Sequence, residues 1–149
     1  MRSVSCTDRI ILVNNVTEKK VAVPIRNDSD IVVARQKGKE LSISCGFSGS
    51  NLTLIATAIS ELARNIILYA GNGEIVLCIV HDKEKQGIEV VARDKGPGIP
   101  DLSLAMQDGY STGQGLGLGL PGTKRLMDEF SIRSVVGKGT TVITRKWSS

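Results

Sequence analysis

The glycine-rich stretch at residues 113–119 is the feature that most constrains what this chain can fold into. Four glycines alternate there with other residues, and a helix is predicted directly after them at residues 120–129. Glycine has no Cβ, so its backbone can approach a ligand closely and adopt positive φ angles without strain. The start of a helix adds unpaired N–H groups and the positive end of the helix dipole. Together these features favour a loop that binds a polyphosphate.

The length and composition predict one soluble domain. A chain of 149 residues is long enough to bury a core, and aromatic residues make up only 3% of it, so the core is expected to be aliphatic. Scarce aromatics argue against single-stranded nucleic acid binding by base stacking. The formal net charge is +4, and the basic residues are scattered. We therefore predict solvated basic surfaces and no nucleic-acid partner.

The cysteines and the apolar runs indicate in which cellular compartment the protein is expected. Cys6, Cys45 and Cys78 are odd in number and far apart, and His81 is the only histidine. A disulfide framework or a zinc site built from Cys and His is therefore not expected. The longest early apolar run, residues 10–13, is too short for a signal peptide or a membrane span. The default expectation is a cytoplasmic protein without a membrane partner.

Two helices are predicted in the first half of the chain. A short strand at residues 20–26 precedes them, and its Pro24 suits a sheet edge. The first helix should run over residues 31–44, with its cap among residues 27–30. The second should begin at a cap on Ser50 or Asn51. Its apolar residues recur at steps of three and four, as in Leu52, Ile55, Ile59, Leu62, Ile66 and Tyr69.

The second half of the chain predicts two strand pairs around a long loop. Strands at residues 74–82 and 88–94 should pair antiparallel across a polar loop at residues 83–87. Residues 96–119 read as a flexible lid, and two further strands are expected at residues 130–136 and 140–147. Residues 1–18 form an arm or edge strand without an assigned role, and residues 19–149 form the domain. The pattern predicts an α+β fold with helices on one face of a mostly antiparallel sheet.

Glycine-rich loops belong to several nucleotide folds. A Rossmann loop lies between a first strand and a helix, whereas residues 113–119 come late in the chain. A Walker A loop needs GxxxxGK[ST], and residues 137–140 lack that spacing. A protein-kinase glycine-rich loop needs a far larger domain. A purely structural glycine-rich loop stays open on the glycines alone.

Glu61 and Asn65 are the first candidate site residues. They are four residues apart on the second predicted helix, so their side chains share one face. A carboxylate and an amide oxygen are hard ligands that suit Mg²⁺, and a carboxylate also suits a general base. The alternative is a solvated pair that only stabilises the helix.

Asp94 is the second candidate. It ends a predicted strand and is followed by Gly96 and Gly98. A carboxylate at this position can accept a hydrogen bond from an exocyclic amine, and the glycines would let a flat base approach. The alternative is an Asx-type turn at the end of a strand.

Four segments taken in order resemble the ATP-site motifs of the GHKL superfamily, which includes gyrase B, Hsp90 and the histidine kinases. The segments are residues 61–65, 94–98, 113–119 and 137–140, and the resemblance extends over about residues 28–147. It implies a two-layer α/β sandwich, the Bergerat fold. Three main helices would cover one face of a mostly antiparallel sheet, and a flexible lid would close over ATP.

The resemblance also implies roles for individual residues. Glu61 would be the catalytic base, and Asn65 would bind the Mg²⁺ that contacts the phosphates. Asp94 would accept a hydrogen bond from the adenine amine. The ATP-binding residues would be Asn65, Asp94, Gly96, Gly98, Gly113, Gly115, Gly117, Gly119 and Thr140. These roles suit phosphoryl transfer, in which positioning and charge neutralisation do most of the catalysis.

Within the superfamily, residues 58–71 and 119–130 resemble the corresponding segments of the small switch kinases of the bacterial stressosome. Those kinases belong to the anti-sigma-factor type of serine/threonine kinases. This resemblance implies ATP-dependent phosphorylation of STAS-domain scaffold or antagonist proteins. Release would follow, and then activation of a PP2C-type phosphatase through its regulatory domain. The alternative is an anti-sigma factor that sequesters a sigma factor and phosphorylates its STAS-domain antagonist. A bare ATPase or a nucleotide-gated binding module is the third hypothesis.

Overall fold

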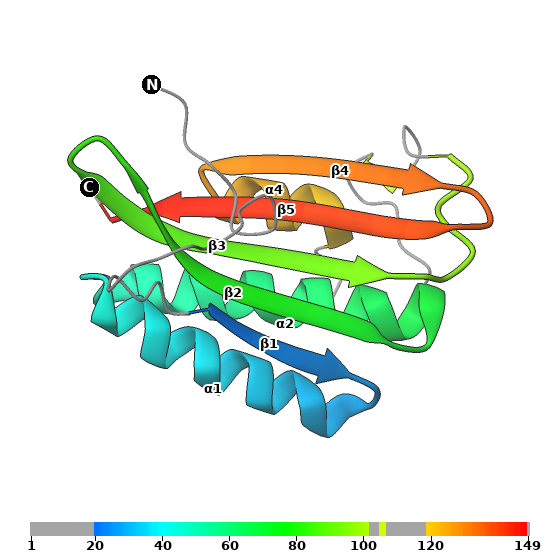
Figure 1. Ribbon diagram of the computed structural model, residues 1–149, viewed down its shortest axis with the longest axis horizontal. Helices are drawn as coiled ribbons and strands as arrows, with labels where there is room; N and C mark the ends of the chain where they lie inside the picture. The colour runs from blue at the N-terminus through cyan, green and yellow to red at the C-terminus, as the bar shows by residue number, and fades with distance from the viewer. Residues whose placement is uncertain (1–19, 102–104, 107–118, 149) are drawn as a thin grey trace.

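The chain folds as one sheet covered by helices on one side (Figure 1). The computed structural model describes residues 20–101, 105–106 and 119–148. In chain order its elements are β1 (Lys20–Ile25), α1 (Asp28–Ser44), α2 (Ser50–Ala70), β2 (Gly73–Asp82), β3 (Lys85–Asp94), α4 (Gly119–Leu126), β4 (Glu129–Val135) and β5 (Gly139–Trp147). The predicted arm at residues 1–18 and most of the predicted lid lie outside the described residues.

The five strands form one antiparallel sheet in the order β1-β2-β3-β5-β4. The hairpins β2–β3 and β4–β5 account for the two predicted strand pairs, and β5 inserts beside β3. β1 is an edge strand, as its Pro24 predicted, because an edge tolerates a residue without an N–H donor. The predicted α+β sandwich is therefore confirmed.

α1 begins earlier than the sequence predicted. Asn27 caps it through its side-chain oxygen, which accepts a hydrogen bond from the backbone N–H of Asp30. Asp30 also accepts hydrogen bonds from the backbone and guanidinium of Arg26, at 2.8 Å and 3.0 Å. The helix ends at Ser44, and Cys45 caps it before Gly46, whose φ of 97° lets the chain turn away.

α2 is the central helix of the helical layer. Gly49 caps it without a side-chain hydrogen bond, so the predicted caps Ser50 and Asn51 are wrong by one or two residues. Its length and mean hydropathy would suit a membrane span. Its apolar face, however, packs into the core against the sheet, as in the central helix of a soluble domain. Gly71 ends it with a φ of 85°, as predicted.

Two predicted boundaries in the second half were wrong. The loop between β2 and β3 contains only Lys83 and Glu84, because Asp82 already pairs with Lys85. α4 ends at Leu126 and not at residue 129, because Glu129 pairs with β5 instead.

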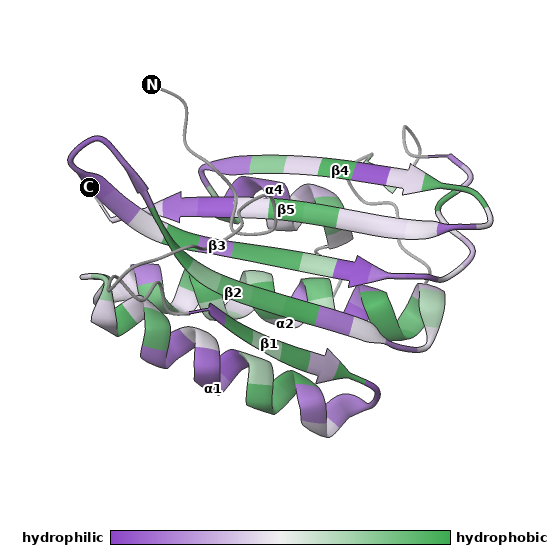
Figure 2. Ribbon diagram, in the orientation of Figure 1, coloured by the Kyte–Doolittle hydropathy of each residue, from purple (hydrophilic) through white to green (hydrophobic). Residues whose placement is uncertain are grey.

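β2 and β3 are buried on both faces. Ile75 and Leu77 of β2 belong to the core beneath the helices, whereas Cys78 and Val80 form a second apolar cluster with Trp147 on β5. Figure 2 shows β2 coloured hydrophobic along its central stretch and β3 coloured hydrophobic in parts of its middle. Two-sided burial explains why residues 74–82 form a near-continuous apolar run in the sequence.

Candidate nucleotide site and catalytic carboxylate

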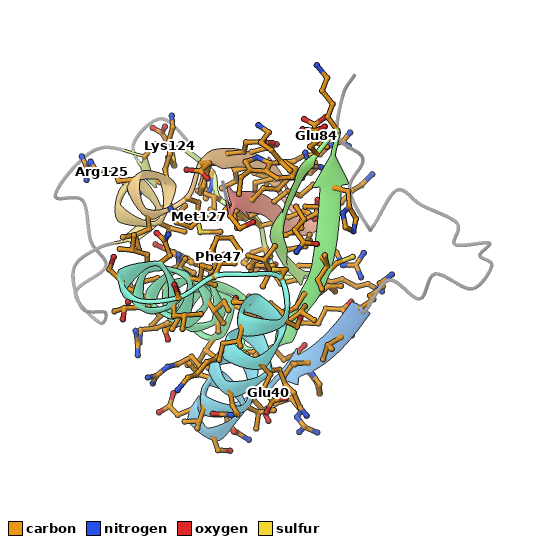
Figure 3. All side chains as sticks on the ribbon, turned by 90° about the vertical axis from the view of Figure 1, so that its left-hand side faces the viewer. Glu40, Phe47, Glu84, Lys124, Arg125 and Met127 are labelled. Atoms are coloured by element: carbon orange, nitrogen blue, oxygen red, sulfur yellow. The ribbon has the colours of Figure 1, made fainter. Side chains whose placement is uncertain are left out.

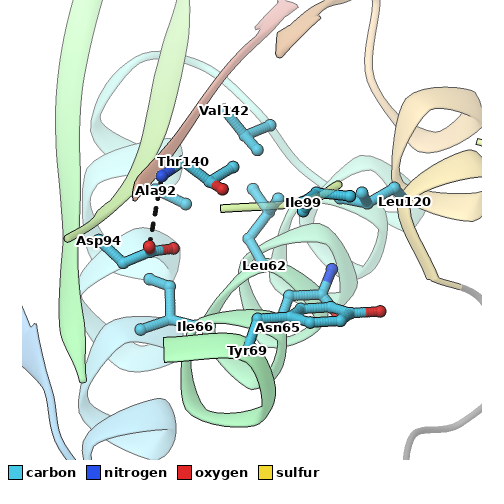
Figure 4. A pocket seen from close by; sticks show the side chains of 10 residues that line it. All are labelled: Leu62, Asn65, Ile66, Tyr69, Ala92, Asp94, Ile99, Leu120, Thr140 and Val142. Atoms are coloured by element: carbon cyan, nitrogen blue, oxygen red, sulfur yellow. Dashed lines mark hydrogen bonds between the residues drawn. The ribbon is translucent and has the colours of Figure 1, made fainter. Parts of the chain in front are cut away.

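A pocket lies between the C-terminal half of α2 and the ends of β3 and β5 nearest to it (Figure 4). Its empty volume is about 340 Å³, including its open mouth. Its lining is mostly apolar with three polar residues and one tyrosine: Leu62, Asn65, Ile66, Tyr69, Ala92, Asp94, Ile99, Leu120, Thr140 and Val142. A narrow apolar slot with few polar groups suits a flat heterocycle such as a purine base.

Asp94 is the polar group at one wall of this pocket. One carboxylate oxygen, Oδ1, accepts hydrogen bonds from the backbone N–H of Gly96 at 2.9 Å and of Thr140 at 3.3 Å (Figure 4). Within the part of the chain that the structure describes, the second oxygen accepts no hydrogen bond from protein. The Asx-type turn and the ligand role are therefore compatible, because each uses a different oxygen.

Thr140 is fixed by a short network across the β4–β5 hairpin. Its hydroxyl lies 2.8 Å from the hydroxyl of Ser134, its direct cross-strand partner. Ser134 Oγ also accepts a hydrogen bond from the backbone N–H of Ile99 at 2.7 Å. The network joins the loop after β3 to the hairpin, so Asp94, Ile99 and Thr140 are held relative to one another.

The glycines around Asp94 have a packing role. A Cβ on Gly96 would lie 2.5 Å from Cβ of Ala70 at the end of α2. Gly98, with a φ of 80°, packs its backbone against the carbonyl of Val135. A Cβ on Gly139 would collide with the carbonyl oxygen of Asp94 itself. These close backbone approaches explain structurally why glycine occupies these three positions. The sequence associates Gly96 and Gly98 with base binding, and their contact with a nucleotide stays a prediction.

Asn65 and Tyr69 carry the polar groups on the α2 side of the pocket, beside Leu62 and Ile66 (Figure 4). The Asn65 Nδ2 atom is buried and has no hydrogen-bond partner among the residues that the structure describes. An unsatisfied buried amide costs on the order of 1–3 kcal/mol, so this group is suited to a ligand. The amide nitrogen and oxygen exchange places by a half-turn of the side-chain amide, so either atom can face the pocket.

Glu61 lies one helical turn before Asn65 but does not line the same pocket. Its side chain is 3% exposed and accepts a hydrogen bond from a guanidinium N–H of Arg64 at 2.9 Å. Glu61 lines a separate, open groove between α1 and α2. The structure therefore brings together Asn65, Asp94 and Thr140, with the loop of Gly96 and Gly98 beside them, and places Glu61 on the neighbouring surface.

The groove beside Glu61 is wide and basic. Its empty volume is about 1480 Å³, including open space. Arg35 and Lys39 of α1 line it opposite Thr57, Ser60 and Arg64 of α2. Such a surface suits a macromolecular partner more than a small molecule, because it is open along its length and carries several cations.

The predicted phosphate loop is described only at its last residue. Gly113, Gly115 and Gly117 lie outside the described residues. Gly119 begins α4 with a φ of 59°, and its carbonyl accepts a hydrogen bond from the hydroxyl of Thr123 at 3.0 Å. Leu120 then lines the pocket. The start of α4 therefore borders this pocket, and its contact with phosphates stays a prediction.

Sequence reasoning missed two residues of the site. Tyr69 was assigned to the apolar stripe of α2, although its position four residues after Asn65 indicates that it shares a face with that amide. Ser134 carries no sequence signal, because its contact with Thr140 depends on the register of a hairpin that local sequence determines only loosely.

Comparison with known proteins agrees with this geometry. The family model described as "Histidine kinase-, DNA gyrase B-, and HSP90-like ATPase" matches residues 50–147. The serine/threonine-protein kinase RsbT of Bacillus subtilis (strain 168) is 54% identical over 125 residues, which are 84% of this chain and 94% of RsbT. The anti-sigma F factor of Geobacillus stearothermophilus is 35% identical over 100 residues, 64% of this chain and 68% of that protein.

A solved structure supports the fold alone. The mycobacterial sensor histidine kinase MprB superposes with a TM-score of 0.51 at 14% identity, over 88% of this chain and 97% of that chain. The sandwich, the pocket and the matching family model define an ATP-binding domain of the GHKL superfamily, to which this chain belongs. Within that superfamily it is a serine/threonine kinase of the RsbT-like group.

Proposed function

We propose that this protein transfers the γ-phosphate of ATP to a serine or threonine hydroxyl of a STAS-domain scaffold or antagonist protein. The main observation behind the proposal is that two residues of α2, one turn apart, line two different cavities. Asn65 lines the nucleotide pocket, and one turn earlier Glu61 lines an open basic groove. A protein kinase needs this arrangement, because its two substrates must approach one catalytic carboxylate from different sides.

The chemistry of the pocket lining suits the adenine end of ATP. The free oxygen of Asp94 is placed to accept a hydrogen bond from the exocyclic amine, and the apolar walls exclude water from the ring faces. Thr140 adds a hydroxyl beside Asp94. The described chain offers no acceptor of equal strength elsewhere in this pocket, so Asp94 is the residue proposed to select adenine.

The chemistry of Asn65 fits Mg²⁺. Among the described residues no cluster of three His, Cys, Asp or Glu side chains could hold a metal. Mg²⁺, however, is commonly held by one or two protein oxygens together with phosphates and waters. The amide of Asn65, with its unsatisfied buried atom, is the proposed protein ligand. The ion would supply charge neutralisation at the phosphates.

Glu61 is the proposed general base. It would accept the proton of the substrate hydroxyl as that oxygen bonds to the γ-phosphorus and the bond to the β-phosphate oxygen breaks. Arg64 holds the carboxylate in one orientation through the 2.9 Å hydrogen bond. Glu61 is only 3% exposed, and a partner docked in the groove would exclude the remaining water from it, which would favour transfer to protein over hydrolysis.

The proposal extends to a partner switch. The unphosphorylated STAS protein would hold the kinase, and a phosphate on the docked surface would weaken docking by its added charge and desolvation cost. The released kinase would then activate a PP2C-type phosphatase through its regulatory domain, as part of a cytoplasmic stressosome response. The identity to RsbT over most of the chain supports this function over a bare ATPase.

An anti-sigma function is the second candidate, because several related proteins are named anti-sigma F factors. A competition binding experiment separates the two. We would immobilise the purified protein and present a STAS scaffold protein, the regulatory domain of a PP2C-type phosphatase and a sigma factor from the same organism. The proposed function predicts capture of the first two. A stoichiometric complex with the sigma factor would contradict it and favour the anti-sigma function.

A further inference from the structure

Ser134 lies on the face of β4 that the helices cover. Every second residue of β4 is partly buried, and Phe130 and Ile132 of this set pack against the main core. Ser134 continues the set by one step, because side chains alternate between the two faces of a strand. Figure 3 shows the helical layer on one side of the sheet. The apolar row on that side therefore ends in a hydroxyl, directly across from Thr140 of the nucleotide pocket.

The hydroxyl of Ser134 has three polar neighbours. Its oxygen accepts a hydrogen bond from the backbone N–H of Ile99 at 2.7 Å. It lies 2.8 Å from the hydroxyl oxygen of Thr140 and 3.4 Å from the carbonyl oxygen of Gly139. Ile99 and Thr140 both line the pocket (Figure 4), so Ser134 supports two of the lining residues from behind.

These distances assign the hydroxyl protons. A hydroxyl has one proton to donate and two lone pairs that accept, and the N–H of Ile99 occupies one lone pair of Ser134. Hydrogen bonds from a hydroxyl to an oxygen are usually about 2.5–3.0 Å long. Thr140 at 2.8 Å is therefore a better acceptor for the Ser134 proton than Gly139 at 3.4 Å. Thr140 accepts this proton and keeps its own proton for a group in the pocket.

A donor at Thr140 complements one edge of adenine. The backbone N–H of Thr140 bonds to Asp94 at 3.3 Å, so the Thr140 hydroxyl lies beside that carboxylate in the pocket lining. Adenine presents a donor amine next to an acceptor ring nitrogen, which matches an acceptor at Asp94 and a donor at Thr140, directly or through one water. Guanine presents the reverse order, a carbonyl oxygen next to a ring N–H. A fixed donor at Thr140 therefore favours adenine over guanine.

We propose that Ser134 is a positioning residue for adenine selection, because it donates its proton to Thr140 and so fixes the Thr140 hydroxyl as a donor toward the purine. This role rests on the proposed function, since ATP must be the ligand of the pocket. Ser134 acts through Thr140 and does not itself line the described pocket. Without Ser134, the Thr140 hydroxyl could rotate and accept the ring N–H of guanine. ATP and GTP would then be discriminated less well.

The first test measures the affinities of ATP and GTP by calorimetry for the wild-type protein and for Ser134→Ala and Ser134→Thr. The ratio of the two affinities should fall roughly three- to tenfold in Ser134→Ala, the worth of one oriented hydrogen bond. Ser134→Thr keeps the hydroxyl and should restore the ratio. Ser131→Ala, on the exposed face of the same strand, is the matched control and should leave the ratio unchanged.

The affinity ratio separates positioning from a merely structural role. If Ser134 only held the loop at Ile99, its loss would weaken ATP and GTP alike and leave their ratio unchanged. An unchanged ratio in Ser134→Ala, or a fall that Ser134→Thr does not restore, would overturn the role of Ser134 alone. Failure of the proposed function gives a different result: wild-type protein that binds no ATP, or that binds GTP equally well, would overturn both.

The second test is a double-mutant cycle that asks whether Ser134 acts through Thr140. Thr140→Val removes the second hydroxyl, so adding Ser134→Ala to it should lower the ATP-to-GTP affinity ratio almost no further. Full additivity of the two losses would show that Ser134 acts by another route and would overturn the proposed role. Thermal melts check that each variant is folded. If Ser134→Ala does not fold, Ser134→Cys takes its place, because its thiol is a weaker donor of similar shape and should lower the ratio in the same direction.

Discussion

Glu61 and Asn65 lie one turn apart on α2 and open onto different cavities. Asn65 lines the narrow pocket with Asp94 and Thr140, whereas Glu61 lines the basic groove between α1 and α2. A single turn of one helix therefore separates the two cavities. Under the proposed function, this separation would place the base beside the phosphates and outside the adenine pocket.

Replacing Glu61 should slow phosphoryl transfer and leave ATP affinity almost unchanged. Glu61→Gln keeps the shape and an acceptor for Arg64 but removes the base, so phosphoryl transfer should fall on the order of 10²–10⁴-fold. ATP affinity should change little, because Glu61 does not line the pocket. Single-turnover transfer and calorimetric ATP binding would measure both. The matched control is Glu74→Gln, a partly exposed carboxylate paired with Arg93. Loss of ATP binding in the Glu61 variant alone would show that its role is misassigned.

Replacing Asp94 should have the opposite effect. Asp94→Asn retains an oxygen for the N–H groups of Gly96 and Thr140 but turns the second oxygen into a donor that opposes the adenine amine. We expect ATP affinity to fall roughly 10- to 100-fold, equivalent to about 1.4–2.7 kcal/mol. The preference for ATP over GTP should shrink as well. Asp28→Asn on the exposed start of α1 is the control. An unchanged nucleotide preference would argue against adenine recognition by this residue.

The β4–β5 turn offers a matched pair of glycines. Gly139 has a φ of 127°, and a Cβ there would collide with the carbonyl oxygen of Asp94; Gly137 has a φ of 83°, and a Cβ there would meet no atom within 4 Å. Gly137→Ala should therefore cost only the backbone strain, about 1–2 kcal/mol. Gly139→Ala should cost more and also weaken ATP binding, because it displaces Asp94. Thermal melts and ATP titrations would test this, and equal effects of the two changes would contradict it.

The start of α1 predicts a pH dependence. The guanidinium of Arg26 holds the pKa of Asp30 below its ordinary value of 3.8, through hydrogen bonds and then charge attraction. A group with a lowered pKa in the folded state stabilises the protein above its ordinary pKa and loses that contribution as the pH falls. Asp30→Asn should therefore lower the Tm at pH 7, and the difference from wild type should shrink below about pH 4. Asp28→Asn, in the same first turn, controls for helix dipole effects. A difference in Tm that does not change with pH would contradict the assignment.

Much of this fold was predictable because its turn signals are strong. Gly71 ends α2 with the positive φ that its sequence context predicted, and the two hairpins follow from apolar runs separated by polar turns. The errors arose where tertiary pairing overrides local pattern. Lys85 looks like loop sequence but pairs with Asp82, and Glu129 looks like helix but pairs with Arg145.

The site was predictable to the extent that its residues have motif-like spacing. Asn65, Asp94 and Thr140 were identified in advance and line one pocket. Ser134 was not, because only the strand register brings it opposite Thr140. The packing role of Gly96 was also missed, because it depends on where the last turn of α2 lies, and no pattern within the loop encodes that position.

The most direct test of the kinase function is intact-mass spectrometry of a STAS-domain partner incubated with this protein and Mg-ATP. We expect one added phosphate on the partner with wild-type protein and almost none with Glu61→Gln, although the variant binds ATP normally. Rapid transfer by the Glu61 variant would contradict Glu61 as the base. No transfer by a wild-type protein that binds both ATP and the partner would contradict the kinase function itself.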